Sequence, residues 1–287
     1  MEALIDGVRD RYVVRVQHHS KNLHKADTSP VNNTWLPLLF PSSVESLLLL
    51  YYPPPPPNLQ TKANNMRKFN AVIQLPERDG TEYYVAAGTK YAIIRNSTDG
   101  DDRILEGPHE IKGNCPILKN TGWDRIDGAV GVPGLPNQFY IFHGGKYIRA
   151  TLNKKLDKVQ NEGIKYIESN WGPLTKVGFN TIDAGYPYTD EADKMVFYSG
   201  TEFVEYSWKD NKVVSGPKDF THEEDYQKAG FNRIDAVFPS GDKKIWYYFC
   251  GNKYLRYKYD GARSGSKTLE SGPWLIAESF ESFRNWP

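Results

Sequence analysis

Short apolar runs rich in aromatic residues recur along the chain from residue 66 to residue 287. Each is followed by glycine and then by a run that alternates polar and apolar residues, as in Lys146–Arg149 and Lys253–Tyr257. An alternation of two residues is typical of a half-buried strand, and a glycine-bounded linker of two residues between such runs predicts a hairpin. A polar stretch and a fourth short strand complete each unit, so we expect repeated four-stranded antiparallel sheets.

Three sequence markers repeat four times with nearly one period. The first, an Asn or Asp before a small-residue segment, occurs at spacings of 57, 56 and 52 residues, at Asn70, Asp127, Asp183 and Asp235. The second, a turn glycine before the alternating run, occurs at spacings of 56, 56 and 51, at Gly88, Gly144, Gly200 and Gly251. The third, a glycine followed mostly by proline, occurs at spacings of 56, 53 and 56, at Gly107, Gly163, Gly216 and Gly272.

A repeat of this length indicates a propeller or a solenoid. One small sheet cannot bury both of its faces, so four must pack around a common axis. We therefore predict an all-β, four-bladed β-propeller over residues 66–287, with blades of about 66–121, 122–177, 178–229 and 230–287. Small residues such as Ala71, Gly128 and Gly185 belong on the crowded innermost strands. The 19 Tyr, 13 Phe and 7 Trp fill the layers between blades, and Phe280, Phe283 and Trp286 cover the seam between the last blade and the first.

Residues 1–65 differ from the rest and include five consecutive prolines, Pro53–Pro57. Such a run forms an extended spacer without internal hydrogen bonds. We expect a mostly irregular N-terminal extension, either disordered or an artefact of the gene model with translation starting at Met66. No apolar run there approaches the roughly 20 residues of a membrane-spanning helix, and no signal peptide is recognisable. The expected location is cytoplasmic.

Charge and motif content exclude several function classes. Lys and Arg number 36 against 35 Asp and Glu, so no overall basic field favours nucleic acid or an anionic membrane. No nucleophile, phosphate-binding or paired-histidine metal motif is present. A non-enzymatic protein is favoured over an enzyme that uses the propeller channel. The two cysteines, Cys115 and Cys250, occupy different places in their repeats, and we expect both to be free thiols.

Each repeat resembles the hemopexin-like repeat in the order of its motifs. These are Ile-Asp-Ala-Val, an aromatic strand, Gly-x-Lys-Tyr-x-Arg, Gly-Pro and Gly-Phe-Asn, as at Ile234–Val237 and Gly251–Arg256. The likeness spans residues 66–287 and is closest in form to the hemopexin-fold seed albumins of legumes, the albumin-2 type. The resemblance implies a four-bladed propeller with a central channel, and a seed protein that binds a small molecule, namely a polyamine such as spermine, haem, or both. Relatives that act as lectins or as protein-docking modules supply the alternative functions.

The resemblance also implies a metal-binding channel, in which main-chain carbonyls of the innermost strands hold a cation such as calcium. Sodium or chloride ions would bind in the same channel. The residues carried over are Asn70, Asp127, Asp183 and Asp235 at one level and Val72, Ala129, Gly185 and Val237 at the next. Carbonyl oxygens are suitable calcium ligands. The alternative is that each Asn or Asp accepts hydrogen bonds from nearby backbone amides and fixes a turn.

The ligand-binding residues stay unassigned from sequence. His109, His143 and His222 fall at unrelated repeat positions, which favours surface roles over haem ligation. Asp127, Asp183 and Asp235 at the channel rim suit a polyamine, and Glu202 and Glu205 make the third blade acidic where others are basic. A lectin would need exposed aromatic residues, for which Trp171, Tyr206 and Trp208 are the candidates. A homodimer in which a second copy caps the channel is compatible with this fold.

Overall fold

The structure is a computed structural model that describes residues 69–76, 79–97, 100–156, 159–188, 191–241, 244–259, 267–284 and 286, together with the backbone of 3–8 and 11–16. The chain divides into two compact units, Met1–Pro54 and Pro55–Pro287. In the first unit, β1 (Ala3–Val8) pairs antiparallel with β2 (Arg11–Val16). The rest of the predicted extension, including Pro53–Pro57 and Met66, lies outside the described residues, so its disorder and the proposed start at Met66 stay predictions.

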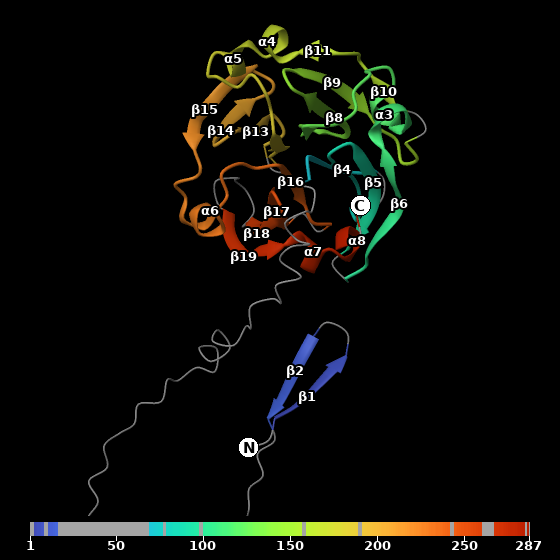
Figure 1. Ribbon diagram of the computed structural model, residues 1–287. Coiled ribbons are helices and arrows are strands. Elements are labelled where there is room, and N and C mark those ends of the chain that lie inside the picture. The colour runs from blue at the N-terminus through green and yellow to red at the C-terminus, as the bar shows by residue number, and fades with distance from the viewer. Residues whose placement is uncertain are drawn as a thin grey trace, which may run out of the picture. The chain divides into compact units, whose positions relative to one another are not determined.

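Four antiparallel sheets form a ring in the second unit (Figure 1), which confirms the predicted propeller. Blade 1 consists of β3 (Ala71–Gln74), β4 (Glu82–Ala87), β5 (Lys90–Asn96) and β6 (Asp102–Glu110). Blade 2 consists of β7 (Gly128–Val132), β8 (Leu135–His143), β9 (Lys146–Thr151), β10 (Gln160–Asn161) and β11 (Lys165–Tyr166). Blade 3 consists of β12 (Ala184–Pro187), β13 (Lys194–Ser199), β14 (Glu202–Ser207) and β15 (Lys212–Asp219). Blade 4 consists of β16 (Ala236–Pro239), β17 (Ile245–Cys250), β18 (Lys253–Tyr259) and β19 (Lys267–Leu275).

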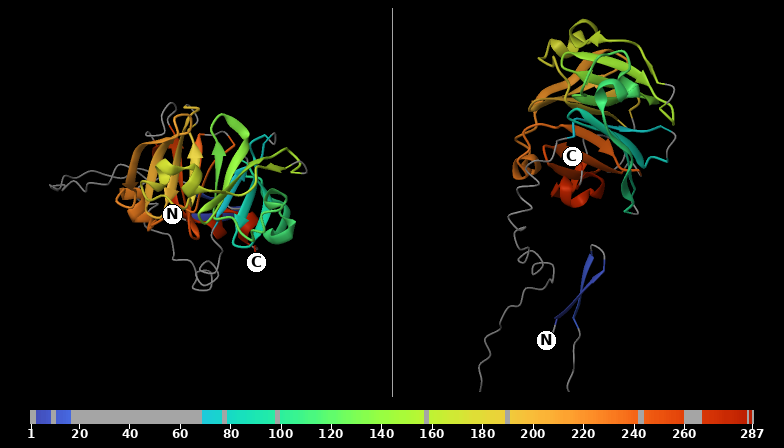
Figure 2. Two further views of the ribbon diagram at one scale, coloured as in Figure 1. Left: turned by 90° about the horizontal axis from the view of Figure 1, so that it is seen from above. Right: turned by 45° about the vertical axis from the view of Figure 1, so that its right-hand side comes forward.

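Short helices connect the blades. They are α3 (Ile111–Asn114), the 3-10 turn η1 (Pro116–Leu118), α4 (Ile167–Asn170), α5 (Gly172–Thr175), α6 (Glu224–Ala229), α7 (Ile276–Ser279) and α8 (Glu281–Arg284). In the described residues, none of the helices has the length and apolar character needed to cross a membrane. Figure 2 shows the ring from the side, with strands of the blades running roughly along its axis.

Blade 2 departs from the four-strand prediction because its outer strand is divided into β10 and β11, which both pair with β9. In the other blades the outer strand is continuous and bulges at Gly107, Gly216 or Gly272. A Cβ on any of these glycines would lie 2.7–3.0 Å from a carbonyl oxygen of the neighbouring strand, so only glycine permits this close pairing. The equivalent Gly163 has nothing within 4 Å of a Cβ, consistent with the local separation of the two strands.

The hydrophobic core is divided into four clusters, one at each interface between neighbouring blades. The innermost strands β3, β7, β12 and β16 contact one another in that order and close the ring. Small residues are required where they meet: a Cβ on Gly128 would lie 2.7 Å from the carbonyl oxygens of Ile182 and Asp183 in the next blade. The predicted placement of small residues on these strands is therefore confirmed.

The C-terminal segment closes the seam between blade 4 and blade 1, as the sequence predicts. The ring of Phe69, ahead of β3, lies 4.9 Å from Phe249 of blade 4 and 4.4 Å from Phe283 of α8, between centroids. Ser282 donates to the Asp102 carboxylate of blade 1 through its hydroxyl, at 2.5 Å, and its backbone N–H, at 3.3 Å. Closure therefore uses aromatic packing and hydrogen bonds without a covalent bond.

Tyrosines dominate the interface between blades 3 and 4. Burial raises the pKa of Tyr198, Tyr226 and Tyr248 well above the ordinary value. The ammonium of Lys267 lies 4.7–5.1 Å from the ring centroids of Tyr226, Tyr248 and Tyr257, and burial lowers the Lys267 pKa. The ammonium therefore lies in a half-buried cage of three aromatic rings, where it also donates to the Tyr226 hydroxyl at 2.6 Å and lies 3.8 Å from the Glu223 carboxylate.

We expect the folded state to lose stability as the pH rises above about 10, because tyrosines of the unfolded chain then ionise while the buried ones stay neutral. Raised folded pKa values give a stability contribution that is complete below about pH 10 and is lost as the pH rises further. The lowered pKa of Lys267 acts in the opposite direction up to the unfolded lysine value of about 10.4, so Lys267→Met should steepen the onset of the alkaline loss. Urea unfolding at a series of alkaline pH values, with ultraviolet titration of tyrosinate, measures both effects. An unchanged free energy of unfolding would contradict the prediction.

Candidate functional site

The four repeated Asn and Asp residues perform one structural task. Each side chain accepts a hydrogen bond from the backbone N–H of the turn glycine in the hairpin beside it. The distances are 2.8 Å for Gly88 to Asn70 Oδ1, 2.8 Å for Gly144 to Asp127 Oδ2, 2.7 Å for Gly200 to Asp183 Oδ2 and 2.6 Å for Gly251 to Asp235 Oδ2. We call these the four Asx–glycine bonds. They join the first two sequence markers in a single interaction.

The turn glycines have φ between 55° and 61°, a left-handed conformation that favours glycine. This conformation belongs to the tight turn between the second and third strands of each blade, and the N–H of the turn is directed at the start of the innermost strand. An amide oxygen accepts this bond as well as a carboxylate oxygen does, which explains why Asn70 replaces Asp in blade 1. The turn-fixing alternative therefore accounts for all four side chains.

Arginines compensate two of the carboxylates. Arg125 Nε donates to Asp127 Oδ1 at 3.0 Å, and His143 Nδ1 lies 3.3 Å from the other oxygen of Asp127. Arg233 Nε donates to Asp235 Oδ1 at 2.7 Å, which raises the pKa of the guanidinium. Among the described residues, no group of three or more His, Cys, Asp or Glu side chains is arranged to hold a metal ion.

A cavity of about 360 Å³, the channel cavity, lies between the innermost strands, toward the ends opposite the Asx–glycine bonds. Each of those strands contributes two residues of equivalent position: Val72 and Gln74, Ala129 and Gly131, Gly185 and Pro187, Val237 and Pro239. The predicted second-level residues Val72, Ala129, Gly185 and Val237 are thus brought together, and they line the cavity with apolar groups. With a rise of about 3.3 Å per residue, Gly131 lies about 13 Å along the strand from Asp127.

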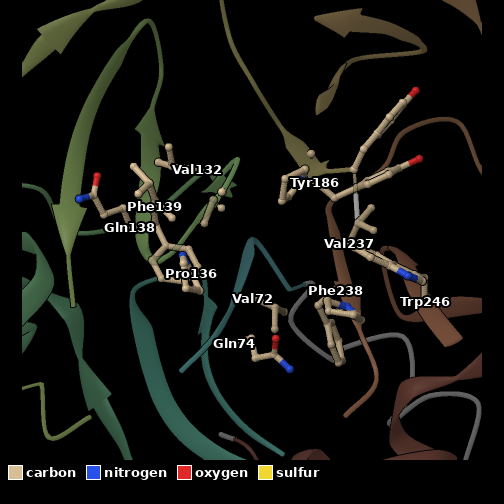
Figure 3. A pocket seen from close by; sticks show the side chains of 18 residues that line it. Val72, Gln74, Val132, Pro136, Gln138, Phe139, Tyr186, Val237, Phe238 and Trp246 are labelled. Carbon is tan, nitrogen blue, oxygen red and sulfur yellow. The ribbon is translucent and has the colours of Figure 1, made fainter. Parts of the chain in front are cut away.

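Aromatic side chains form much of the remaining wall (Figure 3). They are Phe139, Tyr186, Tyr188, Phe238 and Trp246, all buried in the protein. Both glutamine side chains of the lining form hydrogen bonds within the protein. Gln74 Nε2 donates to Gly80 O at 2.9 Å, and Gln138 Oε1 accepts from Arg149 Nε at 2.8 Å. No Asp, Glu, Lys, Arg or His belongs to the described lining. The cavity is therefore suited to a neutral, largely apolar molecule.

The predicted histidines lie away from this cavity. His109 and His222 are on the surface, beside Glu106 and Asp219 respectively, and His143 is half-buried against Asp127 and the Trp123 ring. Glu202 and Glu205 lie on β14, where Glu202 faces Asp219 across the strand pair. None of these side chains lines the cavity.

Two of the three aromatic residues considered as sugar platforms prove to be core residues. Trp171 and Tyr206 are 6% and 2% exposed and stack on each other at 5.7 Å. Trp208 is half-buried, and its indole N–H donates to the Tyr140 hydroxyl at 2.8 Å. Trp171, between α4 and α5, and Tyr206, on β14, are therefore not candidates for an exposed sugar platform.

Cys115 and Cys250 are both free, as predicted, and both are buried. The Cys115 sulfur lies 3.2 Å from the Tyr84 hydroxyl, and burial raises the pKa of the thiol. A raised pKa lowers the thiolate fraction and with it the reactivity. Cys115 is therefore a packing residue.

Solved structures resemble the ring closely in shape. The hemopexin-fold protein CP4 of cow pea aligns with a TM-score of 0.67 at 17% identity over 77% of this chain and 99% of its own. The chain has the hemopexin fold. The seed albumin LS24 of Lathyrus sativus gives a TM-score of 0.66 at 19% identity, covering 76% of this chain and 96% of its own. A plant lectin of Cicer arietinum with two metal-binding sites aligns with a TM-score of 0.63 at 19% identity. The alignment covers 76% of this chain and 97% of the lectin chain.

No protein-family model and no curated protein matches the chain. At these identities the solved structures establish the fold and leave the ligand open. Within the hemopexin fold, the resemblance inferred from the repeat markers is confirmed, and the four Asx–glycine bonds explain why those markers recur.

We predict that Asp235→Ala lowers the free energy of unfolding by about 1–3 kcal/mol, because the buried Asp235 carboxylate is the acceptor of the half-buried Gly251 N–H. Asp235→Asn should cost less, since an amide oxygen performs this role at Asn70. Asp210→Ala, at a surface carboxylate, should change stability by no more than about 0.5 kcal/mol. Chemical denaturation measures all three. Equal stability of the Asp235→Ala and Asp210→Ala proteins would refute the role assigned to this bond.

Proposed function

We propose that the protein is a non-enzymatic binding protein that holds a neutral, largely apolar small molecule in the channel cavity. The observation that carries this proposal is the wall of aromatic, valine and proline side chains without a charged group. Its volume of about 360 Å³ lies within the range of about 300–1,000 Å³ common for small-molecule sites. The solved structures of similar shape are named as seed albumins and a lectin, which supports binding in place of catalysis.

The lining favours a neutral molecule over spermine or haem. The ammonium groups of a polyamine would lose water in this cavity without meeting a carboxylate, which is costly. Asp127, Asp183 and Asp235 belong to the opposite end of the innermost strands and accept the Asx–glycine bonds. Haem would find no histidine in the described lining, where the Tyr186 hydroxyl already accepts from the Tyr259 hydroxyl at 3.1 Å, and its propionates would lack a cationic partner there.

We also propose a calcium ion in the channel, held by main-chain carbonyls. The side chains of Asn70, Asp127, Asp183 and Asp235 already accept hydrogen bonds from the turn glycines. The main-chain carbonyl oxygens of the same residues are therefore the ligands that we propose for the ion. A solved structure of this shape is named as a lectin with two metal-binding sites, which supports metal binding by the fold. The buried free cysteines support the proposal of a reducing, cytoplasmic location.

Filling the cavity should abolish binding of a neutral apolar probe. Gly131→Leu adds a side chain whose Cβ would lie 3.5 Å from Pro187 Cγ, an ordinary contact, so the fold should tolerate it. We expect Nile red to bind the full chain with enhanced fluorescence and to bind Gly131→Leu at least about 10-fold more weakly. Gly172→Leu, in open space, is the matched control.

Competition then separates the ligand classes. Spermine should leave Nile red bound, and haemin should displace it only weakly. Strong displacement by either would reverse the preference for a neutral ligand. Equal Nile red affinity of wild type and Gly131→Leu would remove this cavity as the binding site.

Calcium should raise the melting temperature, with a stabilisation of about 2.7 kcal/mol at 100 times the dissociation constant. Replacing Asp127, Asp183 and Asp235 together by Asn keeps hydrogen-bond acceptors but removes their charges. If carbonyls hold the ion, the calcium response of this variant should persist. Loss of the response would show that carboxylates are ligands, and no response in wild type would exclude the site. Differential scanning calorimetry with calcium and with a chelator makes the comparison.

A further inference from the structure

A second cavity, of about 450 Å³, lies away from the channel at the outer edge of blade 2. Its lining is polar except for one aromatic ring, and consists of Gly145, Lys146, Tyr166, Glu168 and Asn180. The residues come from the β8–β9 turn, from β9, β11 and α4, and from the loop leading to blade 3. Figure 1 shows β11 and α4 at the rim of the ring.

Tyr166 is the most exposed large hydrophobic side chain among the described residues, at 53%. It ends β11, opposite Lys146 in the strand register, and the following Ile167 N–H donates to Gly145 O at 3.0 Å. Lys146 Nζ lies 5.8 Å from the centre of the Tyr166 ring. The backbone therefore holds an aromatic face in solvent beside an ammonium group.

The polar groups around this ring are available to a ligand. Within the part of the chain that the structure describes, neither Lys146 nor Glu168 forms an ion pair. The Asn180 amide nitrogen makes a long contact of 3.4 Å with Gly178 O, which leaves its oxygen as an acceptor. An ammonium donor, a carboxylate acceptor and an amide thus line one cavity together with an exposed ring.

The arrangement is specific to blade 2. The positions equivalent to Tyr166 and Lys146 are Glu110 opposite Lys90 in blade 1, Asp219 opposite Glu202 in blade 3 and Leu275 opposite Lys253 in blade 4. In blade 1 the lysine is already paired, with Lys90 Nζ 3.8 Å from Glu110. Since the fold is built equally well without an aromatic residue at this position, packing does not account for Tyr166.

We propose that this cavity is a carbohydrate-binding site for a neutral sugar. An aromatic ring offers a flat apolar surface that matches the C–H face of a pyranose, while hydroxyl groups at the ring edge both donate and accept hydrogen bonds. Glu168 and Asn180 would accept from sugar hydroxyls, and Lys146 would donate to them. One positive and one negative group leave the site without net charge, which favours a neutral sugar over a uronic acid or an amino sugar. The site is separate from the channel cavity and does not depend on the function proposed for it.

The test uses saturation-transfer NMR and calorimetric titration of the full chain with methyl glycosides of glucose, galactose, mannose, N-acetylglucosamine and N-acetylgalactosamine. At least one should bind, and Tyr166→Ala should weaken that binding at least about 10-fold. Glu168→Gln should weaken it less, because an amide retains one acceptor oxygen. Trp274→Ala is the matched control, since Trp274 is 44% exposed on β19 of another blade.

Three results would overturn the proposal. They are no binding of any of the five glycosides at millimolar concentration, equal affinities of Tyr166→Ala and wild type, and preferential binding of glucuronic acid or glucosamine. Circular dichroism of each variant checks that the fold is intact. Gly131→Leu should leave sugar binding unchanged, so failure of the channel proposal and failure of this one are distinguishable.

Discussion

The hydrogen bond between a turn glycine N–H and the Asn or Asp that begins each innermost strand is the interaction on which this ring depends. It occurs four times, at 2.6–2.8 Å, and it ties the outward part of each blade to the strand nearest the axis. Without it, the N–H of a tight left-handed turn would lack a protein partner, and the start of the inner strand would be free to shift. Because inner strands of neighbouring blades touch, a shift in one would be transmitted to the packing of the next.

The two ends of the innermost strands differ chemically: the Asx–glycine bonds lie at one end and the channel cavity lies toward the other. The polar end is occupied by side chains that already have partners, including Arg125 and Arg233. The other end has only Val, Gly, Ala, Pro and Gln on the inner strands, backed by aromatic rings. A carboxylate row in the sequence therefore does not create an acidic binding site, because the carboxylates stabilise the scaffold.

The repeat markers were sufficient to predict the number of blades, the small residues at the axis and the closure of the seam by Phe280, Phe283 and Trp286. They were insufficient for the binding surfaces. Trp171 and Tyr166 are both aromatic residues near the end of a blade, yet one is buried and the other exposed, since exposure depends on which neighbouring blade covers the side chain. The one signal that could have pointed to Tyr166 is the Ile164 that follows Gly163 where the other repeats have proline. The outer strand is divided at that point.

Closure of the ring by its last residues has a consequence for synthesis. Ser282 and Asp102 are 180 residues apart in sequence, so their contact forms only after α8 has left the ribosome. Until then, the side of blade 1 that includes Phe69, Val72 and Tyr83 has no partner, because blade 4 and α8 cover it in the finished ring. Contacts of such long separation slow folding, and uncovered apolar surface in a growing chain promotes aggregation. The nascent protein should therefore need the most protection from chaperones until blade 4 and α8 have been synthesised.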